Sequence, residues 1–326
     1  MVTCKHKHIL IAPLDWGLGH TTRCVPLIRF LLRQGHIPLF AGNETQRRFI
    51  ENSMGTIDFI HLEGYNIKYS RWNKYAQIGL LSQLPDILGT IKKEQKWLQQ
   101  LTSARKIDGI ISDNRYGLFH SSVPSVILTH QLQVKSGTGA TADGFVRKLH
   151  YKFMNRFKAV WVVDTPESPG LAGTLSHPDR LPEHASYIGL LSQFENTPSI
   201  AGADKAKLLI LLSGPEPQRS MLSAILWRQV QDFDGHVVFV EGTENAPVPA
   251  RIPENVEWHK RLAGKALEHL LQSAGMVVCR SGYSTIMDLT ALQKQAVLIP
   301  TPGQTEQEYL AERMTKIDGW TVRGQY

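Results

Sequence analysis

Residues 276–308 alternate apolar runs with polar turns in the order strand, turn, helix, strand and loop. The first run, 276–279, is short and apolar throughout, which is typical of a strand buried on both faces of a parallel sheet. Gly282 then permits a tight turn, and apolar residues recur at helical spacing over 286–292. A second apolar run follows at 296–300. This order predicts a strand–helix–strand unit and therefore an α/β fold.

The same alternation extends over the whole chain, whose 326 residues exceed what one hydrophobic core normally serves. Further strand-like runs occur at 8–12, 37–41, 58–62, 109–112, 125–129, 159–163, 207–213 and 236–241. A segment rich in Pro and Gly separates the sixth of these runs from the seventh. We therefore predict two doubly wound, Rossmann-like domains, the first over 1–164 and the second over 204–326, joined by a connector over 165–203.

A glycine-containing loop follows the first predicted strand. Gly17 and Gly19 permit the backbone to approach a ligand closely, and His20 ends the loop where a helix begins. An imidazole at this place can act as a general base or donate a hydrogen bond to a phosphate. The alternative role for His20 is to cap the helix.

Polar residues also follow the strands predicted at 109–112 and 125–129. Asp113 and Arg115 come after the first of these strands, and His130 follows the second. Because open α/β sheets bind ligands at the carboxyl ends of their strands, we expect these side chains to converge on a ligand. Asp113 would orient an imidazole or act as a base itself. The alternative is an internal ion pair between Asp113 and Arg115.

In the second domain, Asp288 lies in the helix that follows Gly282. A carboxylate one turn into a helix is favoured by the helix dipole, and it can accept hydrogen bonds from two vicinal hydroxyls, such as those of a ribose. The alternative role for Asp288 is to stabilise the helix dipole alone. The polar loop after the strand at 296–300 is suited to closing over a ligand.

The segment that begins at Ser281 resembles the donor-binding half of the MurG-like glycosyltransferases of family 28. Their pattern is SGxxTxxE, an apolar strand ending in Pro, and a Gln-containing loop that enters a helix. Ser281, Gly282 and Thr285 match this pattern. Asp288 stands where the family has Glu, one methylene shorter, and Gln307 matches the loop glutamine. The resemblance implies that Asp288 holds the ribose of the nucleotide and that Gln307 holds the transferred sugar.

Two further segments resemble this family. It has a Gly-rich loop ending in Gly-His, a helix and another Gly-His, and this chain has at corresponding places Gly17, Gly19, His20, Gly35 and His36. Arg219 matches the Arg that ends the family's phosphate loop, so the resemblance implies that Arg219 pairs with the donor diphosphate. Pro215 and Pro217 leave this loop fewer N–H donors than a Gly-rich one. Thr243 falls near a family Ser that contacts the donor phosphates.

The resemblance implies the GT-B architecture, in which two Rossmann-like domains face each other across a cleft. The first domain would bind the acceptor and the second the nucleotide-sugar. We accordingly expect a glycosyltransferase that moves a sugar, with inversion, from a UDP-sugar to an acceptor hydroxyl, in cell-envelope glycan or glycolipid synthesis. His20, or failing it Asp113, would accept the proton. The acceptor side would comprise Gly17, Gly19, Arg115 and His130.

No metal is expected, because GT-B enzymes generally stabilise the leaving diphosphate with helix dipoles and side chains. No cofactor is expected either, because the nucleotide-sugar is a substrate. Asp232 and Asp234 have D-x-D spacing but lie at a predicted turn, and His6 and His8 merely alternate at a strand start. The chain ends soon after the last predicted helix, so we expect a shortened protein or one without the helix that usually returns to the first domain.

Three alternatives stay open. Sugar-nucleotide 2-epimerases share this architecture and need no acceptor. A non-catalytic subunit could bind the nucleotide-sugar as a partner or a sensor. Gly17 and Gly19 also begin a G-x-G-x-x-G dinucleotide fingerprint, which is incomplete because Thr22 stands in place of its third glycine.

The formal net charge of +7 favours an anionic partner, which a nucleotide, a phospholipid headgroup or a nucleic acid would satisfy. Residues 65–75 interleave aromatic and cationic side chains, and leucines follow at 80, 81 and 84. We interpret this segment first as an acceptor loop and second as a peripheral membrane contact for a lipid-linked acceptor. Nucleic-acid binding ranks last, and none is expected.

The first residues carry no signal-peptide pattern, and no apolar run approaches the roughly 20 residues that span a bilayer. We therefore expect a cytoplasmic protein, at the cytoplasmic face of the membrane if it meets lipid. The 3 cysteines show no C-x-x-C spacing, which argues against a disulfide framework and a thiolate metal site.

Overall fold

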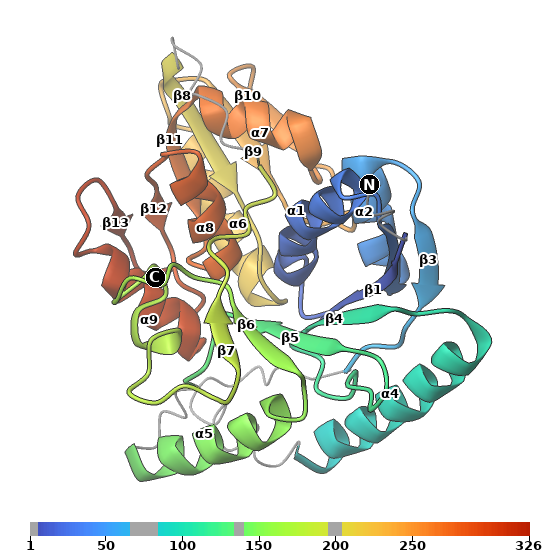
Figure 1. Cartoon of the computed structure of the whole chain (residues 1–326). Helices are drawn as coiled ribbons and strands as arrows, with labels where there is room; N and C mark the ends of the chain where they lie inside the picture. Colours follow the sequence, from blue (N-terminus) through green and yellow to red (C-terminus); the bar gives the residue numbers. More distant parts are fainter. Residues whose placement is uncertain (1–5, 66–83, 134–139, 195–203) are drawn as a thin grey trace. The chain divides into compact units, whose positions relative to one another are not determined.

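A computed structural model of the chain describes residues 6–65, 84–133, 140–194 and 204–326. The chain forms two compact units, Met1–Leu191 and Ser192–Tyr326. Each described unit is built on one sheet whose paired strands all run parallel, with helices between the strands (Figure 1). The predicted fold class, two doubly wound α/β domains, is therefore confirmed.

The first sheet has the strand order β3-β2-β1-β4-β5-β6-β7. Its strands are β1 (His8–Pro13), β2 (Ile37–Gly42), β3 (Asp58–His61), β4 (Gly109–Asp113), β5 (Ser125–Thr129), β6 (Ala159–Val162) and β7 (Ala185–Tyr187). The chain first winds outward from β1 to β3 and then crosses to the other side of β1 with β4. In open α/β sheets the crevice at such a reversal, beyond the carboxyl ends of the strands, is where ligands bind.

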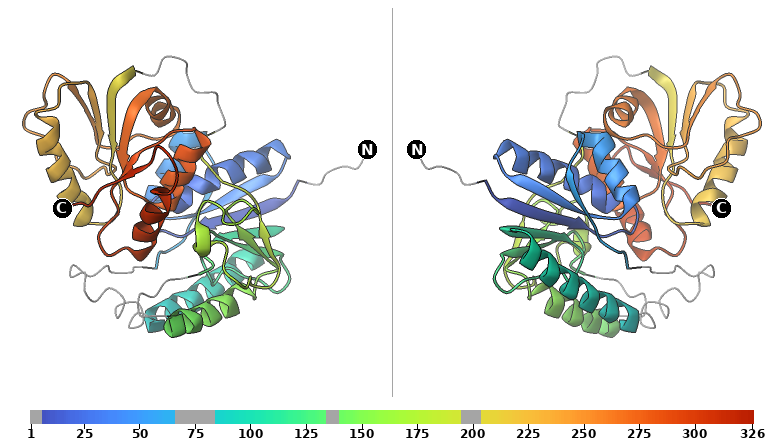
Figure 2. Two further views of the ribbon diagram at one scale, coloured as in Figure 1. Left: turned by 90° about the vertical axis from the view of Figure 1, so that its left-hand side faces the viewer. Right: turned by 90° about the vertical axis from the view of Figure 1, so that its right-hand side faces the viewer.

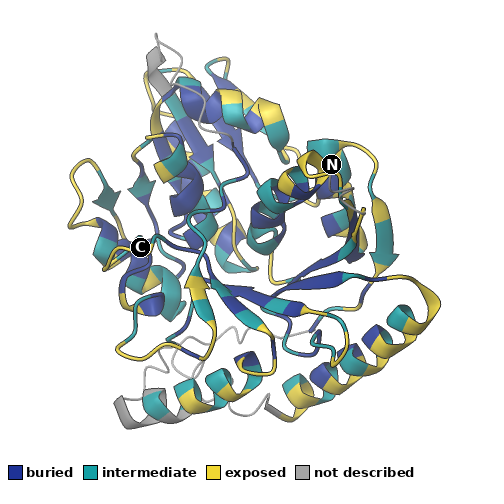
Figure 3. Cartoon of the chain, in the orientation of Figure 1, coloured by how far each residue is buried: buried dark blue, intermediate teal, exposed yellow. Residues whose placement is uncertain are grey.

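Helices cover both faces of the first sheet. They are α1 (Gly19–Arg33), α2 (Glu44–Met54), α4 (Leu84–Ala104) and α5 (Ala140–Met154), with a short 3-10 turn at Gly173–Leu175. Figure 2 shows α1 and α2 on one face and α4 and α5 on the other. The strands are mostly buried, whereas α4 and α5 carry exposed residues along their outer sides (Figure 3). This layering follows from apolar strands that need cover on both faces.

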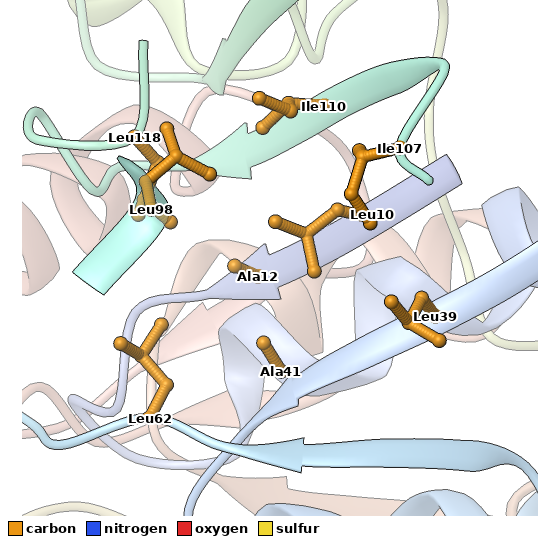
Figure 4. Close-up of a cluster of buried hydrophobic side chains, with 9 residues drawn as sticks. All are labelled: Leu10, Ala12, Leu39, Ala41, Leu62, Leu98, Ile107, Ile110 and Leu118. Atoms are coloured by element: carbon orange, nitrogen blue, oxygen red, sulfur yellow. The ribbon is translucent and has the colours of Figure 1, made fainter. Parts of the chain in front are cut away.

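The hydrophobic core of the first unit is centred on β1. Leu10 and Ala12 of β1 pack with Leu39 and Ala41 of β2 and with Leu98 of α4 (Figure 4). Leu10 and Ala12 have no exposed surface, and Leu98 is 1% exposed. Burial of this kind contributes about 25 cal/mol for each Å² of apolar surface removed from water. The core therefore holds β1 firmly against the neighbours that carry polar residues at their ends.

The second sheet has the order β10-β9-β8-β11-β12-β13 and repeats the same winding. Its strands are β8 (Asp204–Leu211), β9 (Val237–Val240), β10 (Val256–His259), β11 (Ala274–Cys279), β12 (Val297–Leu298) and β13 (Thr321–Val322). Its helices are α6 (Gln218–Val230), α7 (Gly264–Ser273), α8 (Tyr283–Ala291) and α9 (Thr305–Met314). The reversal here lies between β8 and β11, so a ligand is expected beside the loops after these two strands.

The structure differs from the sequence prediction at the edges of both sheets. The segment 165–203, predicted as a connector, contains the 3-10 turn and β7, which pairs with β6 in the first sheet. The division between the units falls after Leu191, inside the segment predicted as the connector. β10 and β13 were not predicted. These elements are short, and none forms a long apolar run that would reveal it.

Most of the aromatic and cationic segment proposed as a membrane contact, residues 66–83, lies outside the described residues. Tyr65, at its start, is buried and donates a hydrogen bond to Glu94. In the part of the chain that the structure describes, no helix combines the length and the apolar character needed to cross a membrane.

Gly242, in the turn after β9, is a point where the fold requires glycine. Its φ is +75°, and a Cβ there would lie 2.0 Å from the carbonyl oxygen of Leu212. We predict that Gly242→Ala lowers the free energy of unfolding by more than the about 1–2 kcal/mol that left-handed backbone alone costs. Urea unfolding measures this change. Gly89→Ala in α4, where a Cβ meets nothing within 4 Å, is the control and should not destabilise the chain. Equal stability of Gly242→Ala and the wild type would contradict the turn geometry.

Candidate active site

Three of the predicted polar residues meet at the edge of the first sheet where the carboxyl ends of its strands lie. Asp113 is the last residue of β4, His20 is the second residue of α1, and His130 follows β5. The N–H of Leu14 donates to the carbonyl of Asp113 at 2.9 Å and so ties the loop after β1 to the end of β4. Since β1, β4 and β5 are neighbours in the sheet, residues about 90 to 110 positions apart come together here.

Arg23 joins these three side chains. Its Nε donates to Asp113 Oδ2 at 2.6 Å, and its Nη2 donates to Oδ1 of the same carboxylate. Nη2 also lies 2.7 Å from His20 Nδ1, and Nη1 lies 2.9 Å from His130 Nδ1. Asp113 has no exposed surface and Arg23 is 1% exposed. The result is a buried bidentate ion pair with an imidazole on either side.

The electrostatics of this cluster separate the roles of Asp113 and His20. Burial alone would raise the pKa of Asp113, but the charges of Arg23 and His20 outweigh it and lower the pKa to about 2. Burial lowers the pKa of His20 below its usual 6.5, against the opposing effect of Asp113. At pH 7, Asp113 is therefore an ionised and very weak base, whereas His20 is neutral and able to accept a proton.

The His20 side chain is 15% exposed, and its hydrogen bonds to described side chains use Nδ1. Nδ1 lies 3.1 Å from Asp113 Oδ1, so one tautomer donates from Nδ1 to the carboxylate and leaves the Nε2 lone pair available. The other tautomer accepts at Nδ1 from Arg23 and carries a proton on Nε2. His20 can therefore act as a base or as a hydrogen-bond donor, depending on the tautomer.

Arg115 does not join this cluster. Its Nε donates to the carbonyl of Pro13 at 2.8 Å, and its Nη1 donates to the carbonyl of Glu63 and to Glu94, both at 2.9 Å. The predicted alternative, an ion pair between Asp113 and Arg115, is not formed either, because Asp113 pairs with Arg23 and Arg115 with Glu94. Arg115 instead ties the ends of β1 and β3 to α4.

Arg23 was not recognised in the sequence. It lies three residues after His20 in α1, which places the two on the same side of the helix. The sequence signal for Arg23 is a charged residue among the apolar positions of a predicted helix, which indicates a buried charge that needs a partner. The partner that explains it, Asp113, is 90 positions away in the chain. Gly17, with a φ of +77°, forms the turn that leads into α1, and Gly19 is the first residue of that helix.

In the second unit, three of the residues predicted to bind the donor, Ser281, Gly282 and Thr285, lie at or just before the start of α8. Ser281 is fully buried and its hydroxyl donates to the carbonyl of Gln307 at 2.8 Å, which joins the turn before α8 to α9. Gly282 is the N-cap of α8, and a Cβ there would meet nothing within 4 Å. Thr285 is the third residue of the helix and is partly exposed. The N-terminus of α8 therefore offers an accessible approach to its backbone N–H groups.

The carboxylate of Asp288 is already engaged. Its Oδ1 accepts hydrogen bonds from the Ser192 hydroxyl at 2.7 Å and from the Gln193 N–H at 3.1 Å, and its Oδ2 accepts from Gln193 Nε2 at 2.8 Å. Burial raises the pKa of Asp288 to about 6, although these hydrogen bonds oppose the rise. Asp288 thus anchors the beginning of the second unit to α8. Its role in holding a ribose stays a prediction.

Gln307 and Arg219 are also engaged within the second unit. Gln307 Oε1 accepts from the N–H of Thr301 at 2.9 Å, and its Nε2 lies 2.5 Å from Gln304 Oε1. Arg219 Nη1 lies 3.0 Å from Glu241 Oε2, and its Nη2 pairs with Glu216. The charge of Arg219 is therefore largely balanced by two carboxylates, which weakens its predicted attraction for a diphosphate.

Thr243 lies in the turn after β9. Its N–H donates to the carbonyl of Lys260 at 3.0 Å, and its hydroxyl accepts from the N–H of Asn245 at 3.3 Å. Its contact with donor phosphates stays a prediction. Among the described residues, no group of three or more His, Cys, Asp or Glu side chains is arranged to hold a metal ion.

Comparison with known proteins supports the resemblance seen in the sequence. Residues 263–322 match the model of the glycosyltransferase family 28 C-terminal domain. The matched segment contains Ser281, Gly282, Thr285, Asp288 and Gln307. A search of curated protein sequences gives no significant match.

Solved structures of glycosyltransferases share the fold of the whole chain. The glycosyltransferase of kitacinnamycin superimposes with a TM-score of 0.66 at 15% identity, covering 98% of this chain and 87% of that one. The spinosyn rhamnosyltransferase SpnG in complex with thymidine diphosphate gives 0.62 at 14% identity, over 97% and 86%. MurG of Acinetobacter baumannii gives 0.52 at 14% identity, over 98% and 86%. At these identities the likeness establishes the fold, which is GT-B as predicted.

The raised pKa of Asp288 predicts a pH-dependent stability. Its folded pKa of about 6 lies above the usual 3.8, so its contribution is fully present below pH 3.8 and is lost as the pH rises through 6. Asp288→Asn is neutral throughout. We predict that the variant gains roughly 2–3 kcal/mol relative to the wild type between pH 4 and pH 8, measured by urea unfolding. The control, Asp232→Asn, removes an exposed carboxylate. A pH-independent difference for Asp288→Asn would refute the raised pKa.

Proposed function

We propose that this chain is a glycosyltransferase that moves a sugar from a UDP-sugar to an acceptor hydroxyl, with inversion at the anomeric carbon. The observation that carries this proposal is the arrangement of His20 against the ionised Asp113 at the crevice of the first sheet, 3.1 Å apart. The GT-B fold and the family 28 match over residues 263–322 support the same chemistry. We assign the acceptor to the first unit and the nucleotide-sugar to the second.

The proposed reaction is a single displacement. The acceptor oxygen attacks the anomeric carbon while its proton passes to His20 Nε2, and the bond from that carbon to the diphosphate oxygen breaks with its electron pair. Asp113 holds the Nδ1 side of the ring and stabilises the imidazolium that forms. Because His20 is neutral at pH 7, it is in the form that accepts a proton. One displacement from the face opposite the leaving group inverts the anomeric configuration.

On the donor side, the N-terminus of α8 suits the diphosphate, because the first N–H groups of a helix and its dipole attract anions. We assign Gly282 and Thr285 to this contact and Gln307 to the sugar hydroxyls. Asp288 would reach a ribose only by exchanging hydrogen bonds with Ser192 and Gln193. For the acceptor we propose a lipid-linked hydroxyl of a cell-envelope glycan or glycolipid, met at the cytoplasmic face of the membrane. The net charge of +7 supports contact with anionic headgroups.

Gly282→Ala tests the donor site without disturbing the fold. The Gly282 backbone, with φ −69° and ψ 141°, suits any residue, and a Cβ meets nothing within 4 Å. If a diphosphate approaches the start of α8, the added methyl will weaken UDP binding by about 1–3 kcal/mol, the usual cost of overpacking. Calorimetric titration with UDP, GDP and NAD measures this effect, with Gly89→Ala as the control.

Selective UDP binding that Gly282→Ala weakens, with an unchanged melting temperature, supports the donor site. UDP binding that the variant leaves unchanged contradicts the placement of the diphosphate. Binding of neither UDP nor GDP would sink the proposed function. Preference for NAD would favour the dinucleotide alternative.

His20→Gln tests the base. Glutamine can donate a hydrogen bond but cannot act as a base, so we predict a fall in kcat of roughly 10²–10⁴-fold. The assay follows UDP release from UDP-sugars on addition of an acceptor mixture. His269→Gln, an exposed histidine of α7, is the matched control. The wild-type kcat/KM should fall only below about pH 6.5, because burial lowers the pKa of His20.

Near-normal turnover by His20→Gln would rule out His20 as the base and leave it the role of a hydrogen-bond donor. Conversion of the donor sugar without any acceptor would favour the 2-epimerase alternative. Tight UDP binding without turnover of any donor would favour a non-catalytic subunit.

A further inference from the structure

Four arginines of the described chain are buried, and three of them have a carboxylate partner. The pairs are Arg23 with Asp113, Arg115 with Glu94 and Arg219 with Glu241. The fourth, Arg280, is 1% exposed, and no carboxylate of the described residues lies within ion-pair distance of it. A buried charge is costly unless an opposite charge balances it. Arg280 is therefore the exception that calls for a physical explanation.

The hydrogen bonds of Arg280 all go to neutral acceptors. Its Nη1 donates to the carbonyls of Ile299 and Pro300, both at 3.2 Å, and its Nη2 donates to the carbonyl of Gln218 and to Gln325 Oε1, both at 2.8 Å. Burial lowers the pKa of the guanidinium only to about 10, so it keeps its charge at pH 7. These bonds fix the orientation of the guanidinium without neutralising it.

The place of Arg280 in the fold is where a ligand is expected. It follows β11 directly, beside the point where the strand order of the second sheet reverses between β8 and β11. Arg280 also donates a hydrogen bond to the carbonyl of Gln218, the first residue of α6. Gly282, two residues after Arg280, is the N-cap of α8. Two helix N-termini in the same neighbourhood add to the positive potential.

Two buried polar atoms in this neighbourhood have no hydrogen-bond partner, Arg280 Nε and Thr301 Oγ1. Both face Gly214, in the loop after β8. A Cβ built on Gly214 would lie 3.4 Å from Thr301 Oγ1 and 3.9 Å from Arg280 Nε. Both atoms therefore lie beside the backbone of Gly214, which is exposed and has no side chain to cover them. An oxygen atom held there would satisfy both of them.

We propose that Arg280 Nε and Thr301 Oγ1 bind an oxygen of a phosphate group beside Gly214. The identity of that phosphate, the diphosphate of the nucleotide-sugar, rests on the proposed function. A phosphate suits the site because it supplies the negative charge that Arg280 lacks and carries several acceptor oxygens. Gly214 has a φ of +101° and no Cβ, which lets the ligand approach the backbone.

We therefore propose that Arg280, and not Arg219, carries the positive charge that contacts the diphosphate. Arg219 was the match to the family's phosphate-loop arginine, but Glu241 and Glu216 already balance its charge. Arg280 has the charge and the position without such a partner. Pro215 and Pro217 remove backbone donors from the loop after β8, and a side-chain N–H and a hydroxyl beside Gly214 replace them.

Thr301→Val provides the test, because valine has the shape of threonine and removes only the hydroxyl. We expect it to weaken binding of both UDP and inorganic pyrophosphate roughly tenfold or more, as for the loss of a hydrogen bond to a charged group. Thr315→Val, an exposed position after α9, is the matched control. Calorimetry gives the dissociation constants, and thermal unfolding establishes that both variants are folded.

The Nε–H resonance of Arg280 provides an independent readout in the intact protein. It is assigned by its disappearance in Arg280→Lys, which keeps the charge but has no Nε. We expect pyrophosphate to shift this resonance in the wild type and in Thr315→Val. Should Arg280→Lys fail to fold, Arg280→Gln serves for the assignment, and the Thr301→Val titration does not depend on either variant.

The outcomes separate this inference from the proposed function. UDP that binds the wild type and Thr301→Val equally, with the Nε–H resonance unmoved, overturns the phosphate subsite and leaves the proposed function intact. Pyrophosphate that binds and moves the resonance, while UDP and GDP do not bind, supports the subsite and overturns the nucleotide-sugar assignment. No binding of any of these probes overturns both.

Discussion

The reversal of strand order beside the first strand of each sheet is the constraint on which the rest of this structure depends. Parallel pairing places the carboxyl ends of all strands at one edge, and the reversal separates the helices that follow two adjacent strands. In the first unit the adjacent strands are β1 and β4, which deliver His20 and Asp113. In the second they are β8 and β11, which deliver Gly214 and Arg280. The winding therefore fixes where these side chains lie in each unit.

Buried charge sets what each of these places can do. Asp113 and Asp288 are both buried aspartates, yet Arg23 and His20 lower the pKa of the first to about 2, whereas burial with only neutral donors raises that of the second to about 6. A permanently ionised Asp113 stabilises a positive imidazole next to it. Asp288 is better suited to accepting hydrogen bonds from neutral groups, which in this structure are Ser192 and Gln193. The neighbours of each carboxylate, and not its residue type, decide its role.

The sequence predicts much of the fold and less of the site. Strands buried on both faces of a sheet are apolar throughout, so most of them can be predicted from the sequence. The edge strand β7 has three residues, and β13 has two, which is too few for a pattern. In the candidate site, His20 and Asp113 follow apolar runs, so the sequence alone singles them out, and their catalytic roles stay a prediction. Arg23 was missed because its role appears only once β1 and β4 are neighbours. The hydrogen bonds of Asp288 likewise join positions 95 and 96 residues apart in the chain.

The two units differ in how completely their arginines are neutralised, and this difference matches the two kinds of ligand proposed. In the first unit, Asp113 balances the charge of Arg23. An unpaired guanidinium next to His20 would oppose protonation of the imidazole more strongly than this ion pair does. A neutral hydroxyl acceptor needs such a base and offers no charge of its own. In the second unit, Arg280 is left without a carboxylate among the described residues, and the ligand proposed there is an anion. A full positive charge beside the diphosphate would also stabilise the negative charge that grows on the leaving group as the glycosidic bond breaks.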